Sequence, residues 1–285
     1  MNRYPVIDTG FTVGVSPMMH YLAEEELFAD MDRNGIDIQM IYQPDECFFH
    51  QTPDWNPYLG NDYIAKIKAI CPERVLGLAT LQMWHQPYTR KDQVRSRNIA
   101  GEELERAIQE LHLDGIRVNP IQHNIAFNDR SIVWSMLEQL LVLQNKTGRR
   151  MLVSVHAYGD SLYNSPEAIA ETAARFPDLI FLMQHAGFVW GGFTVCDVAG
   201  SMQNVFLDLT TMPQYAILYK AYQRFGAGKF CIGTDGPYAD WELKKAILND
   251  FTKDQEEQEL ILGGNLAKLL FAKKPDRNVV NYGQS

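Results

Sequence analysis

The sequence predicts an α/β protein of the (β/α)8 class, a TIM barrel, from three observations. Eight short β-rich runs alternate with longer amphipathic segments along the chain, which is typical of parallel βα units. The chain has 285 residues, and a barrel of eight such units takes roughly 250. No Gly-x-Gly-x-x-Gly turn follows the first run, which disfavours the alternative, a doubly wound open sheet.

Each element is predicted from its local pattern. Apolar residues spaced three and four apart predict the helices, and short runs rich in β-branched residues predict the strands. Ser165 followed by Pro166 predicts a helix start, and Gly226 predicts a helix end. The expected strands are 4–7, 36–42, 75–81, 115–118, 151–155, 179–184, 205–209 and 229–233. The expected helices are 24–33, 62–70, 101–111, 131–144, 166–176, 214–225, 241–249 and 255–271, within a single domain of residues 1–285 whose last part, 272–285, is a polar tail.

Composition excludes several classes of function. The chain has 26 Lys and Arg against 35 Asp and Glu, a net charge of −9, which disfavours nucleic acid as a partner. No apolar run approaches the roughly 18 residues of a membrane span, and the start does not resemble a signal peptide. We therefore expect a cytoplasmic protein that binds a small molecule, and the sequence leaves a homo-oligomer open. Four separated cysteines are expected to be reduced thiols: Cys47, Cys71, Cys196 and Cys231.

Polar residues gather at the ends of the predicted strands, where the chemistry of a barrel lies. The fifth strand ends in "VSVHAYG", the sixth in "FLMQHAGF" and the eighth in "CIGTDGPY". Alternate residues of a strand face opposite sides, so the apolar sets would lie under the helices and the polar sets would face the barrel axis. The residues expected at one mouth are Asp8, Arg117, Asn119, His156, His185 and Asp235.

These motifs carry a family resemblance. The opening "VID", then "MDRNGID", "LDGIRVNP", "VHAYG", "QHAG", "NVFLDLTTM", "IGTDGPY" and "ILGGNLAKLLF" follow one another nearly from end to end. In their order and spacing they resemble the amidohydrolase-related branch of the metal-dependent TIM-barrel hydrolases, the amidohydrolase superfamily, which includes lactonases, aromatic-acid decarboxylases and hydratases. The resemblance implies that His156 matches a metal ligand, that His185 matches a general acid or base, and that Asp235 matches the residue that binds metal and handles the proton of the attacking water.

The chain departs from this family at its first strand. The family opening is Asp-x-His-x-His, but Gly10 and Thr12 stand where the two histidines would be. A catalytic zinc takes three protein ligands and a water, and His156 and Asp235 supply only two. We therefore expect a dismantled metal site and no cofactor. A zinc or other divalent ion held by these two residues is the alternative.

Without a metal, the remaining groups still permit acid–base chemistry. Asp235 with His156 or His185 can activate water. Arg117 can hold a carboxylate through its fixed fork of donors, and we expect Asp8 to form an ion pair with it when the site is empty. Further expected substrate contacts, including aromatic residues that would suit a small planar or sugar-like ring, come from Asn119, Asp8, Tyr158, Trp190 and Tyr238.

Three functions follow from this set of residues. The leading hypothesis is a hydrolase of a small carboxylated lactone or similar activated carbonyl, with little or no metal dependence. The second is a metal-assisted decarboxylase or hydratase of the same family. The third is a catalytically silent barrel that binds a ligand or a partner. The substrate itself is not specified by the sequence, because loops rather than the fold select it.

Overall fold

The computed structural model describes residues 3–14, 24–43, 57–81, 83, 99–157, 161–187, 198–210, 215–237 and 240–271. Eight parallel strands form one sheet in chain order. They are β1 (Ile7–Thr12), β2 (Ile38–Tyr42), β3 (Val75–Thr80), β4 (Gly115–Val118), β5 (Leu152–His156), β6 (Ile180–Gln184), β7 (Val205–Asp208) and β8 (Phe230–Cys231). The sheet closes on itself because the Thr9 N–H donates to Ile232 O and the Thr12 N–H to Gly236 O. The predicted barrel is confirmed.

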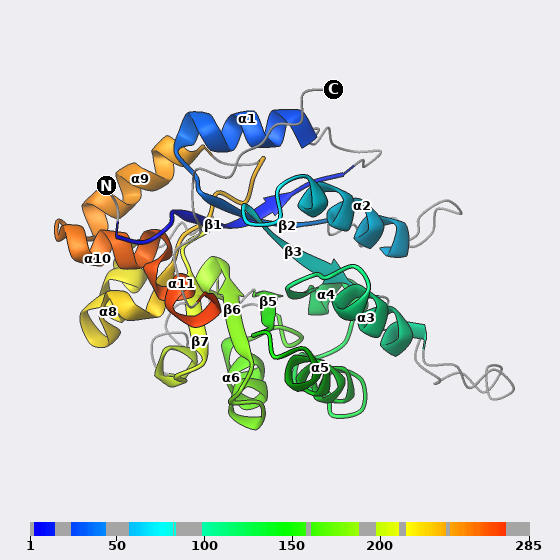
Figure 1. Ribbon diagram of the computed structural model, residues 1–285. Helices are drawn as coiled ribbons and strands as arrows, with labels where there is room; N and C mark the ends of the chain where they lie inside the picture. The colour runs from blue at the N-terminus through cyan, green and yellow to red at the C-terminus, as the bar shows by residue number, and fades with distance from the viewer. Residues whose placement is uncertain are drawn as a thin grey trace, which may run out of the picture.

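Helices alternate with the strands and follow one another around the outside of the barrel (Figure 1). The Ser165 side chain caps α6 as predicted, accepting a hydrogen bond from the Ala168 N–H, and Gly226 ends α8 with a φ of 71°. The helices are α1 (Glu24–Asn34), α2 (Pro57–Ile70), α3 (Ile99–Gln109), α4 (Pro120–His123), α5 (Val133–Thr147), α6 (Pro166–Arg175), α8 (Tyr215–Phe225), α9 (Trp241–Phe251), α10 (Gln255–Glu259) and α11 (Asn265–Leu270).

Strand alternation divides the core into two layers, as the sequence pattern predicts. Val153 and Val155 of β5 pack in the larger layer, between strands and helices. Leu152 of the same strand packs in the smaller layer, which also contains Met40 and Leu182 from other strands. Burial on both faces of every strand makes the barrel a filled core whose free polar chemistry is confined to its ends.

The expected extent of β1 and β8 is wrong. β1 begins at Ile7 and continues to Thr12, so Asp8 lies within the strand and not in a loop after it. β8 ends at Cys231, and Asp235, four residues later, takes a left-handed φ of 56° that a strand cannot contain. Strand alternation therefore does not determine where the Asp235 side chain points.

Two helical expectations also need correction. The expected helix 255–271 is three pieces, because a π-helical turn, Leu260–Gly264, separates α10 from α11. A Cβ on Gly263 would stand 2.1 Å from Pro5 O, so a glycine here lets this turn press against the entry to β1. The short helix α4 was not expected at all.

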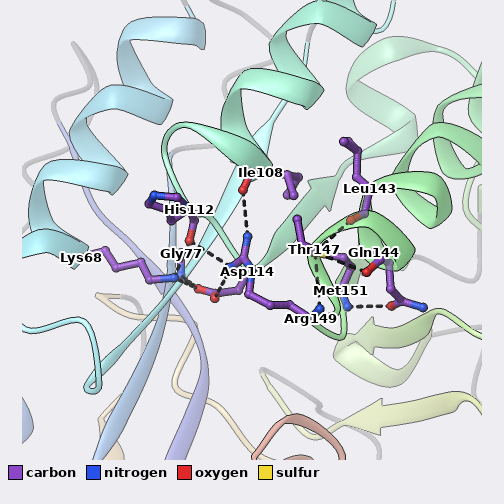
Figure 2. Close-up of polar contacts among 10 residues, drawn as sticks. All are labelled: Lys68, Gly77, Ile108, His112, Asp114, Leu143, Gln144, Thr147, Arg149 and Met151. Carbon is purple, nitrogen blue, oxygen red and sulfur yellow. Dashed lines mark hydrogen bonds and ion pairs between the residues drawn. The ribbon is translucent and has the colours of Figure 1, made fainter.

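At the end of the barrel opposite the mouth, a polar cluster surrounds Asp114, the residue directly before β4 (Figure 2). Its carboxylate accepts hydrogen bonds from Lys68 Nζ at 2.6 Å and from the Gly77 N–H at 2.9 Å. Arg149 lies 3.6 Å from the other oxygen and donates to Ile108 O at 2.8 Å. Because these contacts tie α2, β3, α3 and the entry to β4 together, we assign this end to stability.

Cys71 and Cys231 are buried free thiols, and Cys47 and Cys196 lie outside the described residues. Across the part of the chain that the structure describes, no helix has the length and apolar character needed to span a bilayer.

Candidate active site

Two of the predicted residues, His156 and His185, lie together at the carboxyl ends of β5 and β6. Their ring centroids are 4.8 Å apart with an interplanar angle of 66°. His156 is the last residue of β5 and is partly exposed, whereas His185 follows β6 directly and is 4% exposed. His185 has a left-handed φ of 58°, a conformation that is costly for a non-glycine residue and that concentrates at functional sites.

Arg117 lies at the carboxyl end of β4, one level below the histidines. Strand register pairs it with Thr80 on one side and Ser154 on the other. The side chain is buried, and its guanidinium carbon stands 4.3 Å from the ring centroid of Tyr42. A buried cation requires partners that replace water, and the face of a tyrosine ring stabilises a cation in this way.

Tyr42 and Gln184 were not foreseen in this site. Gln184 Nε2 donates to the Tyr42 hydroxyl at 3.1 Å, and both side chains are buried. Register places Gln184 beside His156. The sequence signal for Gln184 was a polar residue on the inward face of an apolar strand, the same face that carries Leu182 and Ile180.

The Tyr42 hydroxyl occupies the space in front of Gly10. A Cβ on Gly10 would stand 2.9 Å from Tyr42 Oη and 3.3 Å from Gln184 Nε2. Gly10 is the position at which the family resemblance expects a histidine ligand. The space for that side chain is therefore filled by an aromatic residue of the neighbouring strand.

Asp8 supports the loop that carries Asp235. Its carboxylate accepts hydrogen bonds from the Thr234 N–H at 2.9 Å, the Thr234 hydroxyl at 2.6 Å and the Gly10 N–H at 3.1 Å. Among the ion pairs of the described residues none joins Asp8 to Arg117, so the expected ion pair is wrong. Asp8 is fully buried, and burial raises its pKa above the usual value while these hydrogen bonds oppose the shift.

Asp208 supports His185 through Thr210. Its carboxylate accepts hydrogen bonds from the Thr210 hydroxyl and from the Thr210 N–H, the latter at 2.9 Å. Thr210 O then lies 3.1 Å from His185 Nδ1. Burial raises the pKa of Asp208 to about 6, against the opposing effect of these hydrogen bonds. Asp208 was missed in the sequence, although "FLDLT" places an aspartate at the end of an apolar strand.

Lys244 of α9 is a buried lysine whose charge interacts with the carboxylates of the site. The side chain is 3% exposed, and burial lowers its pKa against the opposing charges of Asp208, Asp235 and Asp8. Asp235 itself is partly exposed. Three carboxylates, from the first, seventh and eighth βα units, therefore act electrostatically on one buried ammonium group, which offsets part of their mutual repulsion.

The described residues do not present the ligands of a divalent metal site. Within them no group of three or more His, Cys, Asp or Glu side chains stands close enough to hold an ion. Gly10 has no side chain, and Tyr42 occupies the space in front of it. His156 and Asp235 are too few for a catalytic zinc, which takes three protein ligands.

The structure brings some of the predicted residues into contact and leaves others apart. His156, His185 and Asn119 are in mutual or successive contact, with Asn119 Nδ2 3.0 Å from His156 Nδ1. Arg117 lies on the level below, and Asp235 follows Thr234, whose N–H and hydroxyl bind Asp8. The predicted aromatic contacts Tyr158, Trp190 and Tyr238 lie outside the described residues.

Comparison with known proteins identifies the family of the chain. The family model described as Amidohydrolase matches residues 57–272. No curated protein sequence matches the chain significantly.

Several solved structures share the fold at low identity. The 5-carboxyvanillate decarboxylase from Sphingomonas paucimobilis is 16% identical, with 95% of this chain and 99% of that one covered and a TM-score of 0.66. A dihydroxybenzoic acid decarboxylase from Polaromonas, solved with bound manganese and 2-nitroresorcinol, is 16% identical, with 94% and 97% covered and a TM-score of 0.66. A probable 2-pyrone-4,6-dicarboxylic acid hydrolase from Acinetobacter baumannii, with citric acid bound, is 17% identical, with 94% and 99% covered and a TM-score of 0.61.

Proposed function

Since the chain belongs to the amidohydrolase family, we propose that it is an enzyme that hydrolyses a small carboxylated lactone or a similar activated carbonyl compound, with little or no metal dependence. The observation that carries this proposal is the buried Arg117 guanidinium, which lies over Tyr42 at the mouth that also holds His156 and His185. A permanent positive charge in this position favours an anionic substrate, and its fork of donors suits a carboxylate.

The proposed reaction assigns one role to each group. Arg117 binds the substrate carboxylate and so orients the carbonyl. Asp235 takes a proton from water as the water oxygen bonds to the carbonyl carbon, and the ring C–O bond then breaks. The proton returns from Asp235 to the departing oxygen. General base catalysis of this kind contributes roughly 10²–10⁴-fold, which suits an activated ester better than an ordinary amide.

Decarboxylation of a hydroxylated aromatic acid is the second candidate, and the same Arg117 favours it. Two of the structural neighbours are decarboxylases of aromatic acids. In this case the histidine pair would deliver the proton that replaces the departing carbon dioxide. A catalytically silent barrel that binds a ligand is the third candidate. For all three candidates, a cytoplasmic location and the absence of a nucleic-acid partner stay expectations from the composition.

Turnover under metal-free conditions separates these candidates. The protein, dialysed against a chelator and analysed for residual metal, is incubated with carboxylated lactones and with hydroxylated benzoic acids. Ring opening that persists in the chelator supports the hydrolase, and carbon dioxide release supports the decarboxylase. Binding by calorimetry without turnover supports the silent barrel.

Asp235→Asn tests the assignment of the base. It removes the proposed base while nearly preserving its shape, so hydrolysis should be lost while the affinity for a non-reactive carboxylate is kept. Lactone turnover that needs stoichiometric metal would contradict the leading proposal. The same holds if Asp235→Asn leaves turnover unchanged.

A further inference from the structure

Asn119 has its amide orientation fixed by a helix. It follows β4 as the N-cap of α4, with extended backbone angles of φ −111° and ψ 94°. Its Oδ1 accepts a hydrogen bond from the Gln122 N–H at 3.5 Å. A backbone N–H can only donate, so capping requires the oxygen on this side. The amide NH2 group therefore lies on the other side.

That NH2 group faces His156. Asn119 Nδ2 lies 3.0 Å from His156 Nδ1. Since an amide NH2 group has no acceptor, the histidine nitrogen must supply the lone pair. A neutral imidazole carries one proton, so His156 carries it on Nε2.

The neighbouring histidine is held in the opposite way. His185 Nδ1 lies 3.1 Å from Thr210 O, and a carbonyl oxygen can only accept. The proton of neutral His185 is therefore on Nδ1, and its lone pair is on Nε2. The two rings, 4.8 Å apart, therefore carry one N–H donor and one lone pair at their Nε2 atoms.

We propose that Asn119 is a positioning residue that holds neutral His156 as the Nε2–H tautomer, and so makes this position a hydrogen-bond donor to an oxyanion of the substrate. A histidine that binds metal through Nε2 needs its lone pair there, and its Nδ1–H then donates to an acceptor such as a carboxylate or a carbonyl. Asn119 presents a donor where that arrangement requires an acceptor. The assignment holds whichever reaction the barrel catalyses.

The tautomer is measurable directly. Protein labelled with 15N-histidine gives long-range 1H–15N spectra in which protonated and unprotonated ring nitrogens are distinguished, and His156→Gln identifies the His156 signals. At a pH where the rings are neutral, His156 should show a protonated Nε2 and an unprotonated Nδ1. His185 should show the reverse and serves as an internal reference.

Asn119→Asp changes only the polarity of the contact. Aspartate is an equally good N-cap, but its second oxygen would accept from His156 Nδ1, so the His156 tautomer should reverse. Asn124→Asp is the matched control, because Asn124 caps the other end of the same helix and is exposed. It adds the same charge and should leave both histidine patterns unchanged.

Metal binding gives the second measurement. Titration with Zn²⁺ alone should show at least roughly tenfold tighter binding to Asn119→Asp than to the wild type, the effect expected of a carboxylate behind a ligand histidine, and no gain in Asn124→Asp. A protonated Nδ1 on His156 in the wild type would overturn the proposal, and that spectrum decides even if the variant does not fold. An unchanged tautomer in a folded Asn119→Asp variant, or a reversed one without tighter Zn²⁺ binding, would also overturn it.

Discussion

Replacing Gly10 with alanine tests whether the space for the missing histidine is filled. The new Cβ would stand 2.9 Å from Tyr42 Oη and 3.3 Å from Gln184 Nε2. Tyr42 is 1% exposed and Gln184 is fully buried, so neither side chain can move into solvent to relieve the contact. The substitution therefore adds a methyl group to a packed layer.

The magnitude follows from two opposing effects. Overpacking of a core costs about 1–3 kcal/mol, and restricting the unfolded chain by Gly→Ala returns about 0.4–1 kcal/mol. We expect Gly10→Ala to lower the free energy of unfolding by about 1–2 kcal/mol. Tyr42→Phe alone should cost about 1 kcal/mol through the lost hydrogen bond to Gln184.

The double variant distinguishes a steric clash from a general loss. Gly10→Ala with Tyr42→Phe removes the oxygen that makes the 2.9 Å contact, so the two effects should be less than additive by about 1 kcal/mol, which is typical of residues in contact. Urea unfolding followed by tryptophan fluorescence measures all four proteins. Gly228→Ala is the control, since nothing lies within 4 Å of its Cβ position. Full additivity, or a Gly10→Ala protein as stable as the wild type, would refute the assignment of this space to Tyr42.

Three further outcomes are expected. Arg117→Met should lower kcat/KM for an anionic substrate at least about tenfold, roughly 1.4 kcal/mol. The control Arg149→Met, at the opposite end of the barrel (Figure 2), should leave kcat/KM unchanged. Equal effects of the two variants in a kinetic assay would contradict the role of Arg117 in binding the substrate. Burial raises the pKa of Asp208 from 3.8 to about 6, so its contribution to stability is full below about pH 4 and is lost as the pH rises through about 6. The free energy of unfolding should fall by about 3 kcal/mol over this range. In urea unfolding, Asp208→Asn should flatten this decline, and an unchanged slope would count against the assignment. Asp114→Ala should cost about 1–3 kcal/mol of stability, because it leaves the groups that its carboxylate binds unsatisfied, with kcat/KM preserved; a stability equal to that of the wild type would contradict the assigned role.

Much of the architecture was predictable because it depends on local patterns. Strand and helix periods, together with polar residues at strand ends, placed His156 and His185 at the same mouth. The same rule placed Asp235 there, but the chain bends at this residue in the loop after β8. The alternation of apolar and polar residues does not reveal a single left-handed residue, so the direction of the Asp235 side chain was not predictable.

The parts that could not be predicted depend on contacts between distant residues. Asp8 was expected to pair with Arg117, yet its carboxylate binds Thr234, which lies 226 positions away. Tyr42 fills the space before Gly10 only because β1 and β2 are paired in a particular register. Hydrophobic pattern alone does not fix which of two inward-facing side chains occupies a vacant volume.

The two histidines are held by chemically different parts of the chain, and this gives them different sensitivity to substitution. His185 is held by the peptide carbonyl of Thr210, which every amino acid at that position would supply. His156 is held by the side chain of Asn119, and asparagine and aspartate codons differ by one base. Under the tautomer proposed above, a single nucleotide change at codon 119 would therefore reverse the hydrogen-bonding polarity of His156. At position 210 the backbone supplies the acceptor, and the Thr210 side chain contributes only to its placement, through the hydrogen bond to Asp208.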